Sequence, residues 1–538
     1  MKKLARLVAC LMCICMLLTA CGGVGTEAGP NSVSPTPADG GAIEGTTAPE
    51  TDGTHQSTKD TLVIAVKQDM ADKDPAGNTS NSTVKIKTQV YETLIERTTS
   101  NEYLPLLAES WEWSEDYLTL TVKIKQGIKT HNGEELKASD CLFSLGVLRN
   151  GANSNVTDKM DLEKSHVVDD YTFAIVMQEV YMPVIANLSY PTCAMFSQKG
   201  YEENAGDWSK MDIGTGPYMW GEWVQGDHVD LSAFPEYHVE GMPMIQNVQF
   251  KVIAEDGNRY IEVETGGADM AYEISGVDIA AAQSNPDVTV FREYTNDNAY
   301  LSFNMRKAPF NDVRVRQAIA HCLDLEGAWK VAMNGIGRPA VGLLPDNVKD
   351  SIAGQVQYPM YEYNIEEAKK LLAEAGYPDG FSCTYHAGNL SVRLAYAEYF
   401  ANALKQAGIN VEIVSLDGAT NAQALKVEHN FDIYTWGIAA TNGDIDFANR
   451  FFWSKDSSQR NIMGYNNPEM DELIEAAAKE GDPAKRSDLN AQIQMLALED
   501  VAIIPIYQQE DVHAHVKNLQ GFRNGAYQSP LLKYCYFD

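Results

Sequence analysis

The stretch NNPEMDELIEAAAKEGDPAKRSDLNAQIQMLALEDVAIIPIY, residues 466–507, contains the local pattern that decides the fold. Asn467 followed by Pro468 predicts a helix start, because the asparagine side chain accepts a free backbone N–H and proline has no N–H to lose at the first helical position. A second helix is predicted directly after it, since apolar residues recur three and four positions apart. The stretch ends in VAIIPIY, residues 501–507, an apolar run of strand length. Helices that lead into a buried strand favour an α/β fold.

The same mixture of helix and strand patterns continues toward the N-terminus. Asn364 predicts the cap of another amphipathic helix, residues 365–375. TLVIAV, residues 61–66, is a continuous apolar run typical of a buried parallel strand. Residues 118–125 alternate apolar and polar side chains, which predicts a strand with one wet face, and the polar turn before them predicts a hairpin with Trp111. The sequence therefore favours α/β lobes over a sandwich or a helical bundle.

Length and charge limit the classes of function. The chain has 538 residues and a formal net charge of −32. About 480 residues remain after the low-complexity N-terminal part, which is more than one hydrophobic core usually serves, so two or more lobes are expected. Such an acidic chain repels nucleic acid and anionic lipid headgroups, so neither is an expected partner.

Cysteine and histidine positions give no metal site. The cysteines after Cys21 are Cys141, Cys193, Cys322, Cys383 and Cys535. This odd, scattered set is a poor disulfide framework, and no CxxC pair follows Cys21 that would suggest structural zinc. Small buried hydrophobic side chains are predicted, with a single disulfide left open. His513 and His515 lie on one face of a predicted strand and are interpreted as an exposed pair, because a metal site needs a third ligand.

The N-terminus indicates an export signal followed by a tether. Residues 1–20 combine a basic start with an apolar run too short to span a bilayer. The LTAC pattern that ends at Cys21 resembles the lipobox of bacterial lipoproteins, in which Cys21 would carry the lipid; a plain signal peptide is the alternative. Residues 21–58 are rich in Gly, Ser, Thr and Pro without apolar periodicity, which predicts a disordered linker. The membrane would then be reached through the lipid anchor only.

Several stretches together resemble the family 5 extracellular solute-binding proteins, the peptide/nickel type that serves ABC importers. They follow the family's order and are VYETLIE (90–96), YLPLLAESWEWSEDYLTLTVKIKQGIKTHNGEELKASDCLFSL (103–145), IGTGPYMW (213–220), YLSFNMRKAPFNDVRVRQAIAHCLD (300–324), GYNNPEMDELIEAA (464–477) and AIIPIY (502–507). The resemblance implies an α/β, bilobed periplasmic-binding-protein-like fold of class II, cluster C type. Lobe I would comprise residues 59–90, 190–295 and 500–538, with an extra domain at 91–189, and lobe II would comprise 296–499.

The resemblance also implies a function without catalysis. The protein would hold a small solute between its lobes, either peptide-like, a metal chelate or a sugar, and deliver it to an ABC permease in the cell membrane. It would need no cofactor and no metal, and it would act as a monomer. It would sit on the outer face of the cell membrane, or on the periplasmic side if the host has an outer membrane. A ligand-presenting sensor lipoprotein and a secreted carboxylate-dependent hydrolase are the alternatives.

The resemblance places the second-lobe part of the pocket in YTWGIAATNGDIDFANRFF, residues 434–452. The candidate ligand-binding residues are Tyr434, Trp436, Gly437, Asn442, Asp444 and Asp446. Trp436 falls at the family's tryptophan beside the ligand, where an indole supplies stacking area and an N–H donor. A core tryptophan is the alternative.

This segment departs from the family pattern at one charge. Peptide-binding members carry an aspartate four or five residues after the tryptophan, which pairs with the peptide's α-ammonium, whereas this chain has Ala440 and Thr441. An ammonium buried without a carboxylate is costly, which argues against a peptide held by its N-terminus. Asp444 and Asp446 could serve a cation instead if the segment is extended, or they could lie in a solvated loop.

Overall fold

The structure is a computed structural model that describes residues 56–151, 156–333, 336–456 and 460–538. The predicted signal peptide, the lipid-attachment residue Cys21 and nearly all of the predicted linker lie outside the described residues. Within the described ranges, no helix is both long enough and apolar enough to cross a bilayer.

A mixed sheet of eleven strands forms the centre of the described part of the chain. In spatial order its path is β10 (Tyr218–Val224), β11 (His228–Ala233), β12 (Asn247–Val252), β1 (Thr61–Val66), β13 (Met270–Ala271), β19 (Ile503–Val516), β14 (Val288–Phe303), β18 (Ile433–Ala439), β16 (Phe381–His386) and β17 (Ile409–Val414), while β15 (Arg338–Pro339) pairs with β19. β1 pairs in parallel with β12 and β13, which confirms the predicted buried parallel strand.

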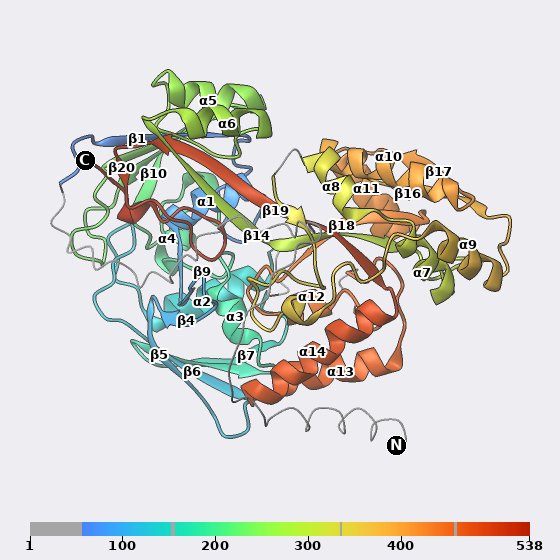
Figure 1. The fold of residues 1–538 in the computed structure, drawn as a ribbon. Coiled ribbons are helices and arrows are strands. Elements are labelled where there is room, and N and C mark those ends of the chain that lie inside the picture. The colour runs from blue at the N-terminus through green and yellow to red at the C-terminus, as the bar shows by residue number, and fades with distance from the viewer. Residues whose placement is uncertain (1–55, 152–155, 334–335, 457–459) are drawn as a thin grey trace, which may run out of the picture. The chain divides into compact units, whose positions relative to one another are not determined.

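The long antiparallel strands β14 and β19 belong to both lobes (Figure 1). Residues Val288–Tyr294 of β14 pair with Glu510–Val516 of β19, and the register then breaks before Asn298. Beyond the break, β14 pairs on its other side with β18. The two strands therefore carry the sheet from the first lobe, built on β1, into the second lobe, built on β18.

Helices and a smaller sheet complete the architecture. First-lobe helices are α1 (Asn81–Val90), α5 (Asp256–Glu264) and α6 (Gly276–Ser284). Second-lobe helices are α7 (Val313–His321), α8 (Leu325–Met333), α9 (Ile365–Glu374), α10 (Ser391–Gln406), α11 (Gly418–Gln423), α12 (Asp446–Asn449), α13 (Pro468–Lys479) and α14 (Pro483–Glu499). The small-sheet region contains β5 (Ala108–Trp113), β6 (Thr119–Ile124), β8 (Thr172–Met177) and β7 (Met160–Asp169), with α2 (Ala138–Arg149) and α3 (Val184–Ser189).

The local sequence signals for these elements are confirmed. The Asn467 side chain accepts a hydrogen bond from the backbone N of Glu469 at 3.0 Å, and α13 starts at Pro468 as predicted. The predicted hairpin is present, with Trp111 opposite Val122. The strand predicted at residues 501–507 is longer than expected, since β19 does not end at residue 507 but continues to residue 516 beside β14.

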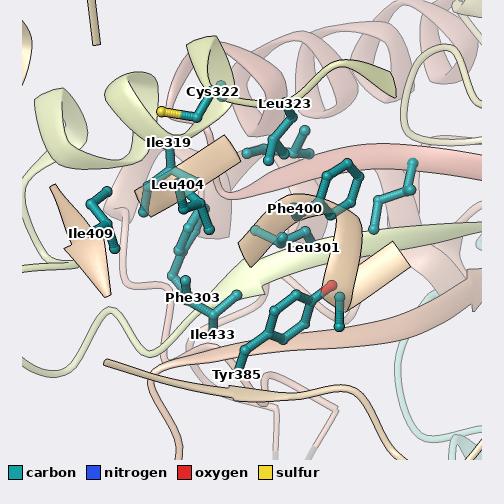
Figure 2. Packing of buried hydrophobic residues seen from close by; sticks show 14 of the residues in the cluster. Leu301, Phe303, Ile319, Cys322, Leu323, Tyr385, Phe400, Leu404, Ile409 and Ile433 are labelled. Carbon is teal, nitrogen blue, oxygen red and sulfur yellow. The ribbon is translucent and has the colours of Figure 1, made fainter. Parts of the chain in front are cut away.

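The core of the second lobe packs helices α7 and α10 against its strands (Figure 2). Leu301 and Phe303 of β14, Ile319 of α7, Phe400 of α10 and Ile433 of β18 are fully buried there. Burying each such side chain contributes about 1.5–3 kcal/mol, so this core fixes the position of β18 relative to β14.

The sequence predicted the burial of the cysteines correctly but not the burial of His513 and His515. The five cysteines after Cys21 are all buried, as predicted, and all are free, so the single disulfide left open is absent among them. The prediction that His513 and His515 form an exposed pair is wrong, since both are buried. β19 is an interior strand, and His513 lies against Tyr272, with ring centres 4.1 Å apart, and stacks on Phe291.

Candidate functional site

A cavity of about 280 Å³ lies where the two lobes meet, and we call it the interlobe cavity. Its lining residues are Thr79, Val84, Arg97, Tyr190, Pro191, Asn296, Asp297, Ala439, Ala440, Thr441, Ala526, Tyr527 and Gln528. These residues come from the register break in β14, the end of β18, the region of α1 and α3, and the C-terminal segment. Segments more than 400 residues apart in sequence thus form one chamber, in which a small molecule would touch both lobes.

The acidic group of the interlobe cavity is Asp297 of β14. It lies opposite Ala439 across the β14–β18 pairing. A side chain at Gly437 would place its Cβ 3.4 Å from Asp297 Oδ2, so this glycine leaves one side of the carboxylate open. Burial raises the pKa of Asp297, and a hydrogen bond from Thr295 and the charge of Arg393 offset part of that rise.

The basic group of the interlobe cavity is Arg97, the last residue of β3 (Ile95–Arg97). Its guanidinium lies over the ring of Tyr527, 4.4 Å from the centre. Nη2 donates to the backbone O of Ala526 at 2.7 Å, and Nη1 donates to Asn101 Oδ1 at 3.3 Å. Among the described residues, Arg97 Nε is buried without a hydrogen-bond partner.

The predicted aromatic residues lie on β18, beside the cavity rather than in its lining. Tyr434 is buried in the second-lobe core, where its ring meets Phe431. Trp436 is half-buried, with Lys426 Nζ 5.2 Å and Arg393 Cζ 5.9 Å from its ring. That Tyr434, Trp436 and Gly437 bind the solute stays a prediction.

Asn442 and Asp444 are held by protein groups. Asn442 Nδ2 donates to Asn187 Oδ1 of α3 at 2.8 Å. Asp444 accepts two hydrogen bonds from Arg486 of α14, both at 2.7 Å. Burial pushes the pKa of Asp444 upward, but the adjacent Arg486 outweighs it and holds the pKa below its usual value. Asp444 is therefore charged and paired at neutral pH.

Asp446 joins the second lobe to the small-sheet region. Tyr181 donates its hydroxyl to Asp446 Oδ2 at 2.7 Å, and Arg450 donates to the same oxygen through Nε at 3.1 Å. Arg450 Nη2 also donates to the Tyr181 hydroxyl at 2.8 Å. We call these bonds, together with the Asn442–Asn187 bond, the interlobe contact.

The interlobe contact revises the environment inferred for this segment. Asp444 and Asp446 are buried, so the solvated-loop interpretation is wrong, and Asp446 begins α12 rather than lying in an extended segment. Their role in solute binding stays a prediction, while their observed partners are arginines, a tyrosine and backbone groups.

Comparison with known proteins identifies the fold and the class. The sequence profile described as "Bacterial extracellular solute-binding proteins, family 5 Middle" matches residues 102–460. The chain belongs to this family. As a family 5 solute-binding protein it binds its solute and is not an enzyme.

The family 5 protein resembles characterised relatives over most of its length. It is 28% identical over 471 residues to the glutathione-binding protein GsiB of Salmonella typhi, covering 86% of this chain and 91% of the relative. DppA of Helicobacter pylori, solved with the peptide STSA, superposes with a TM-score of 0.76 at 23% identity, covering 89% of this chain and 98% of DppA. AppA of Bacillus subtilis, solved with a nonapeptide, superposes with a TM-score of 0.75 at 22% identity. The match covers 90% of this chain and 99% of AppA. The predicted bilobed α/β fold is confirmed.

Sequence reasoning missed the two charged residues of the interlobe cavity. Asp297 and Arg97 are 200 positions apart, and neither stands in a motif that marks it. One signal in the sequence could have led to them, which is that Ala440 and Thr441 stand where peptide-binding members of the family have an aspartate. The loss of that negative charge suggests that a neighbouring strand supplies an aspartate or glutamate in its place. Answering that question requires the register between β14 and β18.

Proposed function

We propose that this family 5 protein captures a small peptide-like solute in the interlobe cavity and delivers it to an ABC import permease. The observation that carries the proposal is the cavity itself, which is lined from both lobes at the point where β14 crosses between them. The peptide-like class is supported by the relatives, since GsiB is a glutathione-binding protein and DppA and AppA were solved with peptides.

Capture would follow from bending at the two crossing strands. The register of β14 and β19 breaks between Tyr294 and Asn298, so few ladder bonds resist a change of angle there. A solute that touches both walls of the cavity binds the closed arrangement more tightly than the open one, and it shifts the population toward closure. The interlobe contact then holds the closed arrangement.

A lipid on Cys21 would hold the receptor near its permease on the outer face of the cell membrane. The basis is the LTAC pattern and the low-complexity residues after it. A tether of this kind raises the effective concentration of receptor at the transporter. In cells fed radiolabelled palmitate we expect label on the full chain and none on Cys21→Ser; label on neither would contradict the anchor.

The function is tested by identifying the solute. Protein purified from its own host should carry a bound small molecule in native mass spectrometry, and that molecule should return unchanged after incubation with the protein. Small-angle scattering should show a smaller radius of gyration when the solute is added back. A chemically converted solute would contradict a transport receptor, and so would an unchanged radius at saturating solute.

A further inference from the structure

The interlobe cavity contains opposite charges that come from different parts of the chain. Asp297 comes from β14 at the crossing between the lobes, and Arg97 comes from β3, next to the small-sheet region. No salt bridge within 4.0 Å involves Asp297 or Arg97 among the described residues. Two buried aspartates of the second lobe are instead paired directly, Asp444 with Arg486 and Asp446 with Arg450.

The lack of an ion-pair partner at these two residues calls for a physical reason. A charge removed from water without a counter-charge is costly, and the chain avoids this cost at Asp444 and Asp446 by pairing each with an arginine. The charge of Arg393 acts on Asp297 through space and offsets part of the rise that burial causes in its pKa, but the two residues form no salt bridge within that limit. A ligand that brings both a cation and an anion would remove the cost at both residues.

Arg97 is held firmly in place. Tyr527 covers one face of its guanidinium, and the backbone O of Ala526 accepts from Nη2. On the second-lobe side, Gly443 has φ +85°, and any Cβ there would overlap the guanidinium. Arg97 lines the cavity, and its buried Nε has no hydrogen-bond partner among the described residues, so the guanidinium keeps an unused donor. A guanidinium fixed in this way matches the two oxygens of a carboxylate.

We propose that Asp297 and Arg97 together make the interlobe cavity selective for a zwitterion, with the ligand's ammonium on Asp297 and its carboxylate on Arg97. This inference rests on the proposed function and specifies the chemistry of the same cavity. Asp297 lies across the strand ladder from Ala439, beside the positions where the sequence lacks the family's aspartate. The negative charge missing directly after β18 would thus be supplied by β14.

The size of the cavity limits the ligand. Its volume of about 280 Å³ far exceeds the roughly 10–15 Å³ that a single water needs, so the cavity has room for a small organic molecule. That space suits an amino acid or a short peptide whose two charged ends both lie inside the chamber.

The test uses the full chain and three equimolar mixtures of di- and tripeptides, which are free, N-acetylated or C-amidated. Binding is measured by native mass spectrometry and by the shift in melting temperature. We expect the free mixture to bind at least about tenfold more tightly than either blocked mixture, the scale of one charge-assisted hydrogen bond. Asp297→Asn should lose the preference for a free amino end, and Arg97→Gln the preference for a free carboxyl end.

Asp488→Asn is the matched control, because this exposed carboxylate on α14 lies outside the cavity lining. It should keep both preferences. If the blocked mixtures bind as tightly as the free one, or if Asp297→Asn keeps its preference for a free amino end, the zwitterion inference is overturned while the proposed function stands. If no mixture binds and no solute co-purifies, both are overturned. Should Arg97→Gln fail to fold, Asp297→Asn and the blocked mixtures still decide the outcome.

Discussion

At the scale of single residues, charge pairing distinguishes the acidic residues predicted from the sequence from the acidic residue that lines the cavity. Asp444 and Asp446 carry the acidic pattern that the sequence offers beside Trp436, yet both are bound by arginines of the same lobe. Asp297 has no salt bridge among the described residues, and it lines the cavity. The acidic residues that the sequence pattern singles out, Asp444 and Asp446, are therefore in ion pairs, whereas Asp297, which no pattern singles out, is in none within the described part of the chain.

Trp436→Ala should weaken solute binding by more than about 1 kcal/mol, the scale of losing one stacked aromatic ring. Isothermal calorimetry with the co-purified solute measures this change. Because Trp436 is half-buried, the melting temperature of the variant is needed to show that it is folded at the temperature of the titration. An unchanged affinity would remove Trp436 from the site.

Asp511 makes stability depend on pH. Burial, partly offset by Lys85 and reinforced by Glu273, Asp297 and Glu293, raises the pKa of Asp511 to about 6. A raised acid pKa favours the folded state while the group is protonated, and this contribution is lost as pH rises through about 6. Asp511→Asn should therefore gain stability over the parent chain at pH 8, by up to about 3 kcal/mol, and the gain should shrink toward pH 5.

Urea unfolding at the two pH values measures the effect of Asp511→Asn. Asp488→Asn removes an exposed carboxylate and should show no comparable gain at pH 8. A gain for Asp511→Asn of equal size at pH 5 and pH 8 would mean that its titration is not the cause.

At the scale of elements, short-range signals set where helices begin. Asn467 caps α13, and its Nδ2 also donates to Asp500 Oδ2 at 3.1 Å, which ties the start of the helix to the end of α14. A cap that also makes a tertiary bond should contribute more than its value in an isolated helix.

Asn467→Ala should lower the free energy of unfolding by about 1–2 kcal/mol, since a cap and a second bond are lost together. Denaturant unfolding followed by circular dichroism measures it. Asn466→Ala, at the exposed neighbour, is the control and should change stability by less than about 0.5 kcal/mol. Equal losses in the two variants would contradict the capping role.

The difference between short-range and long-range contacts explains which features the sequence could predict. Asn467 and Pro468 predict a helix start from contacts within a few residues, and that prediction is confirmed. The true length of β19 and the burial of His513 depend on β14, which lies about 200 residues earlier. The placing of Asp297 against β18 likewise depends on a register between distant strands. The elements and the family were therefore predictable, whereas the charges of the cavity required the assembled sheet.

At the scale of the whole molecule, the interlobe contact would link solute binding to closure under the proposed function. The Tyr181 hydroxyl stands at its centre, because it donates to Asp446 and accepts from Arg450. These bonds join α12 of the second lobe to the small-sheet region, so they stabilise the arrangement in which the cavity is covered from both sides.

Tyr181→Phe should weaken affinity for the co-purified solute several-fold without changing which solutes are preferred, because it acts on closure and not on the cavity lining. Calorimetry and small-angle scattering with and without solute measure the two effects. Tyr363→Phe, at an exposed ring, should behave like the parent chain. A changed order of preference among solutes would instead place Tyr181 in direct contact with the ligand.

The threading of β19 through both lobes also constrains how the chain can mature. The first-lobe part of the sheet consists of β10, β11, β12, β1 and β13. Its β13 edge stays unpaired until residues 503–516 have been synthesised and can pair with β13 and β14. The first lobe, although most of it is encoded early, cannot complete its sheet before nearly the entire polypeptide has been synthesised. A protein assembled in this order stays unfinished while it is being made, which is the condition that a narrow export channel requires of its cargo.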